Sequence, residues 1–144
     1  MNNNDDKYYV PDISDIYDGY ELEYCEDVFK ENKWQTHIHR EGDTYNILSL
    51  GRIYTIRELL ETSLIRVPFL TKEQIEAEGW VKSDIQDNLY YFKNENTGII
   101  YGLMFNFYGK QIIFNTQDAL KSSLYRGECK SINEFRLICK WLKI

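Results

Sequence analysis

Residues 88–115 read NLYYFKNENTGIIYGLMFNFYGKQIIFN, and this stretch decides the fold class. In its centre every second residue is large and apolar or aromatic, a period typical of half-buried strands. Short polar segments that contain glycine interrupt the pattern, as turns do. We therefore expect a three-stranded antiparallel meander. Its strands are Asn88–Lys93, Ile99–Phe107 and Gln111–Asn115, and its turns are Asn94–Gly98 and Tyr108–Lys110.

The same period of two occurs near the N-terminus, where Tyr20, Leu22 and Tyr24 alternate with more polar residues. This alternation predicts a strand with Glu21 and Glu23 on its solvent face. Pro68 has no N–H to donate, so a strand that contains it should lie at an edge or end there. Further strands are expected at Trp34–Arg40, Tyr45–Leu50 (with a helix as the alternative), Leu64–Pro68 and Leu124–Lys130.

Three helix starts carry a capping-box pattern, in which a Ser or Thr is followed three residues later by Glu or Gln. The three starts are Thr55–Glu58, Thr71–Gln74 and Ser131–Glu134. Gly79 is placed to end the second helix. The third helix would bury Ile132, Phe135, Ile138, Cys139 and Leu142 on one face.

These elements predict an α+β fold: a twisted antiparallel sheet of about five to seven strands, with about three helices packed on it. The C-terminal helix would close the core. The length of 144 residues predicts a single domain over residues 1–144, with residues 1–7 as a flexible tail.

The charge of the chain is strongly uneven. Residues 1–31 hold ten acidic and two basic side chains, whereas the whole chain has a net charge of −6. An acidic segment rich in tyrosine favours a partner protein with a basic surface. The predicted partner-binding residues are Asp12, Asp15, Asp18, Glu21, Glu23, Glu26 and Asp27.

The acidic balance argues against direct nucleic-acid binding, which needs a basic surface. The aromatic residues of 90–114 are therefore interpreted as core and not as a stacking platform for bases. Surplus tyrosines, together with Trp34, Trp80 or Trp141, are candidate anchors for a protein contact. No apolar run is long enough to span a membrane, and no secretory leader is expected from the first residues.

His37 and His39 would share one face of a strand, where a third ligand from Glu41, Asp43 or Cys25 could complete a metal site. A solvated strand face is the favoured interpretation, so we expect no metal and no cofactor. No nucleophile elbow, phosphate-binding loop or dinucleotide-binding motif is present, and an enzyme is not expected. The three cysteines are interpreted as reduced thiols, and acidic neighbours should raise the pKa of Cys25.

Three segments carry a resemblance to a known group: YVPDISDIYDGYELEY at 9–24, IRVPFLTKEQIEAEGW at 65–80 and GECKSINEFRLICKWLKI at 127–144. They resemble small proteins encoded by tailed bacteriophages of Bacteroidetes, including crAss-like phages. The resemblance implies an opening strand at Gly19–Glu23, a strand–helix unit that ends at Gly79-Trp80, and a closing helix. It implies no activity and no functional residues.

The resemblance implies a phage origin, which would place the protein in the cytoplasm of the host bacterium or, alternatively, in the virion. The first hypothesis is a non-enzymatic binder of a host protein, such as a counter-defence (anti-CRISPR-like) inhibitor whose carboxylates imitate phosphates. The second is a small virion or assembly component that docks or self-associates through a sheet edge. The third is an enzyme with an unrecognised site.

Overall fold

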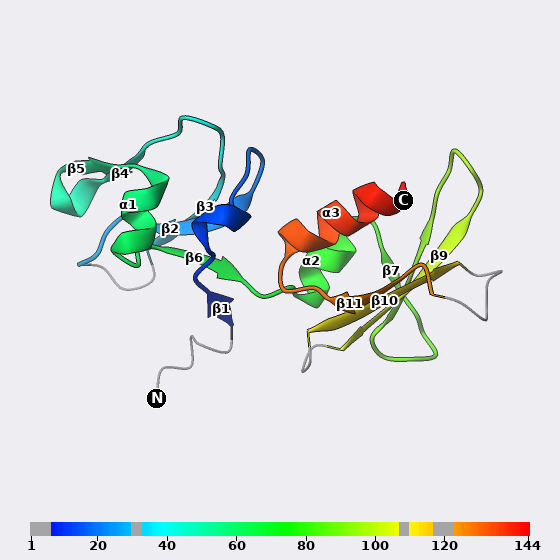
Figure 1. Ribbon diagram of the computed structural model, residues 1–144. Helices are drawn as coiled ribbons and strands as arrows, with labels where there is room; N and C mark the ends of the chain where they lie inside the picture. The colour runs from blue at the N-terminus through cyan, green and yellow to red at the C-terminus, as the bar shows by residue number, and fades with distance from the viewer. Residues whose placement is uncertain (1–6, 30–32, 107–109, 117–122) are drawn as a thin grey trace. The chain divides into compact units, whose positions relative to one another are not determined.

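The computed structural model describes residues 7–29, 33–106, 110–116 and 123–144. The chain forms two compact units, Met1–Phe69 and Leu70–Ile144, and each has a hydrophobic core of its own (Figure 1). The described residues contain eleven strands and three α-helices, and every strand pair among them is antiparallel. The predicted α+β class is confirmed. A single domain would require the two units to fold together, so the predicted single domain stays a prediction.

The first unit is built on a four-stranded sheet in the order β1-β6-β2-β3. Its strands are β1 (Tyr8–Tyr9), β6 (Ile65–Pro68), β2 (Glu21–Cys25) and β3 (Trp34–Ile38). A hairpin of β4 (Tyr45–Ile47) and β5 (Arg52–Tyr54), helix α1 (Ile56–Glu61) and the 3₁₀ turns η1 (Ile13–Asp15) and η2 (Leu48–Leu50) complete the unit.

The period of two in β2 is confirmed, since Leu22 is fully buried and Tyr24 packs against the same core. Leu59 from α1 and Ile47 from the hairpin pack on this inner face of the sheet. The side chains that point the other way form what we call the outer face. By the strand register they are Tyr8, Glu21, Glu23, Cys25, Trp34, Thr36, Ile38, Arg66 and Pro68.

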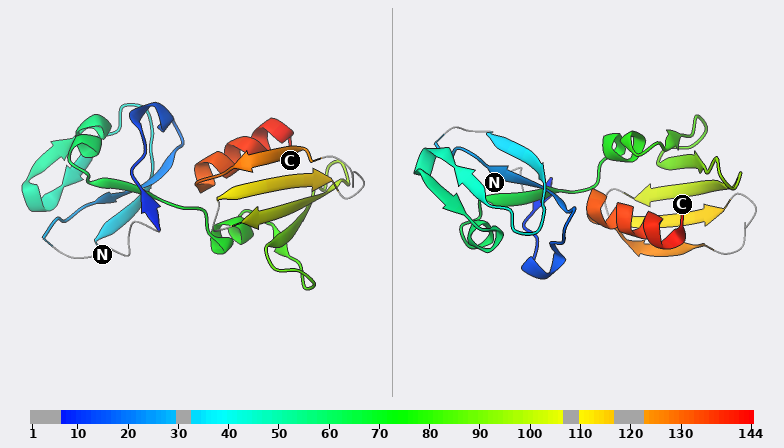
Figure 2. Two further views of the ribbon diagram at one scale, coloured as in Figure 1. Left: turned by 60° about the horizontal axis from the view of Figure 1, so that its bottom comes forward. Right: turned by 90° about the horizontal axis from the view of Figure 1, so that it is seen from above.

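The second unit contains a five-stranded antiparallel sheet in the order β11-β10-β9-β8-β7 (Figure 2). Its strands are β7 (Val81–Lys82), β8 (Leu89–Lys93), β9 (Ile100–Asn106), β10 (Gln111–Thr116) and β11 (Tyr125–Glu128). Helices α2 (Lys72–Ala77) and α3 (Ile132–Leu142) supply Ile75 and Phe135 to its core. The predicted meander is confirmed as β8-β9-β10.

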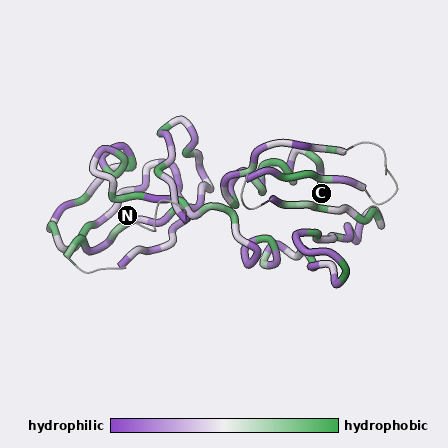
Figure 3. Tube along the Cα trace, turned by 90° about the horizontal axis from the view of Figure 1, so that it is seen from below, coloured by the Kyte–Doolittle hydropathy of each residue, from purple (hydrophilic) through white to green (hydrophobic). Residues whose placement is uncertain are grey.

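The core of this unit is aromatic. Trp80 lies 5.4 Å from Phe92, 5.7 Å from Phe114 and 6.0 Å from Phe135, measured between ring centroids. Hydrophobic and hydrophilic residues are interspersed along the strands (Figure 3), as expected for sheets that are covered on one face. The predicted aromatic core is confirmed for Tyr90, Tyr101, Phe105 and Phe114, which are buried, whereas Tyr91 is 39% exposed and Phe107 and Tyr108 lie outside the described residues.

The strands are divided among three sheets and do not form the single sheet that the periodicity suggested. Pro68, which has no N–H, ends β6 as predicted. Phe69 still donates to the Lys7 carbonyl in the first unit, whereas Leu70 donates to the Lys130 carbonyl in the second. The backbone hydrogen bonds change partner between these two residues.

The capping boxes predicted at Thr55 and Thr71 are confirmed, and Gly79 follows α2 with a positive φ of 97°. The third start differs from the prediction. Ser131 accepts from the Asn133 N–H, but Glu134 accepts from the Lys130 N–H at 2.5 Å, one residue before the cap. The motif still begins α3 where expected.

Three predicted segments lie partly outside the described residues: the tail 1–7, of which only Lys7 is described, the strand Ile99–Phe107, whose last residue is not described, and the turn Tyr108–Lys110, of which only Lys110 is described. The expected strand at Tyr45–Leu50 is shorter, because Leu48–Leu50 forms a 3₁₀ turn. No helix in the described part of the chain has the length and apolar character to cross a membrane.

Replacing Phe114 by alanine should lower the free energy of unfolding by about 3–5 kcal/mol, because the ring is fully buried among other rings. Ile85→Ala is the matched control, since that side chain is 97% exposed and should change stability by less than about 0.5 kcal/mol. Urea unfolding followed by tryptophan fluorescence measures both. Equal effects of the two variants would contradict the assigned core.

Candidate functional site

A charged and aromatic cluster occupies the outer face of the first unit. The guanidinium of Arg66 lies between two rings, with its Cζ 3.7 Å from the centroid of Tyr8 and 4.1 Å from that of Trp34. Its Nε donates to Glu23 Oε1 at 2.9 Å. The Arg66 and Glu23 side chains are only 18% and 16% exposed. Four strands therefore supply one residue each to the cluster.

The cluster combines three residue types, Trp, Tyr and Arg, around one carboxylate. Trp, Tyr and Arg are the residue types that dominate the energetics of protein interfaces. Contacts with two rings and one carboxylate restrict the guanidinium, so the cluster is ordered in the chain by itself. Of these residues, sequence reasoning named Trp34 as an anchor and Glu23 as a contact but missed Tyr8 and Arg66.

The expectation that Glu23 faces solvent is wrong, because its carboxylate is engaged with Arg66 and largely covered. Arg66 follows Glu23 by 43 residues, and only the pairing of β6 with β2 brings them together. Glu21 shares the outer face with Glu23, opposite Ile38 of β3. The remaining predicted acids lie before or after β2.

Asp12, Asp15 and Asp18 precede β2 and stabilise local backbone. Asp12 caps η1 and Asp15 reaches back to the Asp12 N–H, which together form a capping box. Hydrogen bonds from the Ser14 N–H and hydroxyl lower the pKa of Asp12. Asp18 accepts from the Glu41 N–H at 2.9 Å and pairs with Arg40 at 3.4 Å.

Glu26 and Asp27 follow β2 at the end of the sheet where Trp34 lies. The Glu26 N–H donates to the Lys33 carbonyl, and Asp27 Oδ1 accepts from the Phe29 N–H. Within the described ranges, no ion pair involves Asp12, Asp15, Glu26 or Asp27. These four carboxylates keep uncompensated negative charge.

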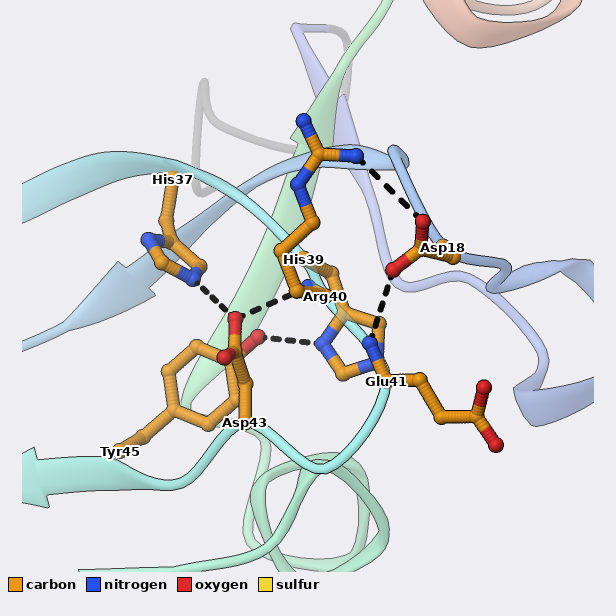
Figure 4. A network of polar contacts seen from close by, with 7 residues as sticks. All are labelled: Asp18, His37, His39, Arg40, Glu41, Asp43 and Tyr45. Atoms are coloured by element: carbon orange, nitrogen blue, oxygen red, sulfur yellow. Dashed lines mark hydrogen bonds and ion pairs between the residues drawn. The ribbon is translucent and has the colours of Figure 1, made fainter.

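The two histidines belong to a polar network beside this sheet (Figure 4). His37 Nε2 donates to Asp43 Oδ2 at 2.8 Å, and the same carboxylate accepts from the Arg40 N–H at 2.9 Å. His39 Nδ1 and the Tyr45 hydroxyl share a hydrogen bond of 2.7 Å. Each imidazole therefore has a protein partner, and the favoured reading of both as solvated is wrong for His39, which is buried.

Titration in the network follows from these contacts. The hydrogen bond from His37 lowers the pKa of Asp43, with a smaller contribution from the Arg40 N–H. Burial raises the pKa of Tyr45, so its hydroxyl stays protonated at neutral pH. Among the described residues, no group of three or more His, Cys, Asp or Glu side chains is arranged to hold a metal.

Among the described residues, neither histidine is hydrogen-bonded to a serine, threonine or cysteine side chain that could act as a nucleophile. In the described part of the chain, the one hydrogen-bond partner of the His37 side chain is Asp43, not a hydroxyl or thiol. The pKa of Cys25 is raised, as expected, although burial is the main cause and the charge of Asp27 a smaller one. Burial also raises the pKa of Cys139 to about 12.

We find no match between this chain and any protein family, curated protein or solved structure.

Replacing Arg66 by alanine should lower the free energy of unfolding by about 2–3 kcal/mol, because Glu23 would keep a largely covered charge without its partner. Arg66→Lys should recover only part of this loss, since an ammonium lacks the planar fork that stacks on both rings. The control is Arg40→Ala. The Arg40 side chain is 63% exposed, so its removal should lower the free energy of unfolding by less than about 1 kcal/mol. Urea unfolding measures all three, and a loss no larger than that of the control would refute the role of Arg66.

The stability that Asp43 provides should depend on pH. Its pKa in the folded chain is lower than in the unfolded chain, so the contribution is present above the unfolded value of about 3.9 and is lost as pH falls through the folded value. The difference in urea midpoint between wild type and Asp43→Asn, followed downward from about pH 5, should thus shrink below about pH 4. A difference that grows as pH falls from about 5 to 3 would contradict the assigned hydrogen bonds.

Proposed function

We propose that this chain is a non-enzymatic protein-binding protein that presents the acidic surface of its first unit to a basic surface of another protein. The observation that carries the proposal is the ordered Tyr8–Arg66–Trp34 cluster, with Glu26 and Asp27, which have no ion pair among the described residues, following β2 at its Trp34 end. Aromatic and arginine side chains give an interface most of its affinity, and surrounding charge gives it specificity and a fast on-rate.

The distribution of charge along the chain supports this assignment. Residues 1–69 hold 14 acidic and seven basic side chains, whereas residues 70–144 hold nine acidic and ten basic ones. The excess negative charge thus belongs to the first unit. It is not spread over the whole chain, as charge that only keeps a protein soluble could be. Because opposite charges attract over about 8–10 Å at physiological salt, a basic partner would be drawn to this unit first.

The partner class follows from the kind of basic surface that acids can occupy. Carboxylates that imitate phosphates would compete for a basic channel that normally holds nucleic acid, as a counter-defence inhibitor of a host nuclease does. The resemblance to phage proteins supports a site of action in the host bacterial cytoplasm. In this proposal the chain itself performs no chemistry and needs no cofactor.

Neutralising Asp12, Asp15, Glu26 and Asp27 together as amides should weaken partner binding at least tenfold, because these carboxylates carry the uncompensated charge. The amides preserve the cap at Asp12, since Asn caps nearly as well as Asp. The matched control neutralises Glu73, Glu76, Asp84 and Glu95, four exposed acids of the second unit. Capture from host lysate, quantified by mass spectrometry at low and high salt, measures both.

We expect basic proteins to be retained by wild type and by the control at about 50 mM salt and released at about 500 mM salt, where charges are screened. Retention by the neutralised variant at the wild-type level would show that these acids are not the contact.

A further inference from the structure

Strand β3 leaves one side of the first unit's sheet open. In the order β1-β6-β2-β3 it lies at the edge and pairs only with β2 among the described residues (Figure 2). Its second and third residues, Gln35 and Thr36, are exposed. An edge strand presents a row of N–H and C=O groups that another extended chain can pair with.

The hydrogen bonds of β3 show which backbone groups face the open side. The His39 N–H donates to the Tyr20 carbonyl, and the Lys33 carbonyl accepts from the Glu26 N–H. Since such bonds recur at every second residue of an antiparallel pair, the odd-numbered residues of 33–39 point their backbone groups at β2. Trp34, Thr36 and Ile38 therefore direct theirs away from the sheet.

The other sheet edges of the described chain are protected, and this one is not. Strands β1 and β7 have only two residues each, and β4 and β5 have three. Strand β11 carries Arg126 and Glu128, which discourage pairing. Strand β3 reads Trp-Gln-Thr-His-Ile, five residues without Lys, Arg, Asp, Glu or Pro and rich in types that favour strands.

We infer that β3 binds an extended basic segment of a partner protein, which adds to the sheet as a fifth strand. Carboxylates stand near both ends of β3: Glu26 and Asp27 beside Trp34, and Glu21 opposite Ile38. Lysine or arginine side chains at the Trp34 end of an added strand would lie near the Glu26 and Asp27 carboxylates. A second copy of this chain is the wrong occupant, because two first units of excess negative charge repel each other.

This inference rests on the proposed function and adds the way in which the partner binds. Strand addition supplies affinity through main-chain hydrogen bonds and specificity through alternate side chains. It follows that basic charge alone should bind more weakly than the same charge on a segment that is able to form a strand.

The test uses the full chain and two labelled 12-residue peptides of equal charge, (Lys-Thr)6 and (Lys-Pro)6, measured by fluorescence anisotropy at about 50 mM salt. Alternate prolines remove the N–H groups that a ladder needs and leave the charge unchanged. We expect (Lys-Thr)6 to bind at least tenfold more tightly. Equal binding of both peptides overturns strand addition and leaves the proposed function standing, whereas binding of neither overturns both.

Thr36→Pro is the matching change in the chain. It removes one N–H that points to the open side and leaves the pairing with β2 intact, as proline in an edge strand can. It should reduce the preference for (Lys-Thr)6 to about twofold or less without affecting (Lys-Pro)6. Thr36→Val keeps the N–H and the branched side chain and should behave as wild type.

Amide hydrogen exchange of the wild-type chain provides a test that needs no variant. On addition of (Lys-Thr)6, the Thr36 and Ile38 amides should exchange at least tenfold more slowly, because they would become hydrogen-bonded. Unchanged exchange of these amides at saturating peptide would overturn the inference.

Discussion

The guanidinium of Arg66 holds together the outer face of the first unit. Removing a cation from water costs several kcal/mol unless charge and hydrogen bonds replace the hydration. Here Glu23 replaces the charge, and the guanidinium carbon lies over the rings of both Tyr8 and Trp34. Because each partner comes from a different strand, β1, β2, β3 and β6 must all be in register for the cation to be satisfied. The same contacts that stabilise the sheet thus order its outer surface.

The acidic residues divide according to what they contact. Asp18 and Glu23 are paired with arginines, so their charge is locally matched. Asp12 and Asp15 support a turn, and Glu26 and Asp27 lie at the end of β2, with no ion pair described for any of the four. The negative charge available to a partner is consequently smaller than the count of acids suggests. Of these four, Glu26 and Asp27 lie at the end of the sheet where Trp34 begins β3.

Local patterns predicted the elements well, because each has a cause within a few residues. The box at Thr55 begins α1, and the alternation around Tyr101 marks a strand with one buried face. Predictions failed where a distant residue intervenes. Glu23 was predicted to face solvent, but the pairing of β6 with β2 places Arg66 beside it. His39 was predicted to be solvated, but it is buried and hydrogen-bonded to Tyr45. Periodicity also could not tell that the strands belong to three sheets, since it does not specify which strands pair.

By itself, then, the sequence determined the α+β class, the meander of the second unit, the helix starts and the concentration of acids near the N-terminus. These follow from side-chain alternation, capping and charge, which act over short distances along the chain. Only the tertiary structure decided which acids are neutralised, that Arg66 joins Tyr8 and Trp34, and that β3 is the unprotected edge. Those outcomes depend on strand order, and strand order is set by contacts between residues that are far apart in the sequence.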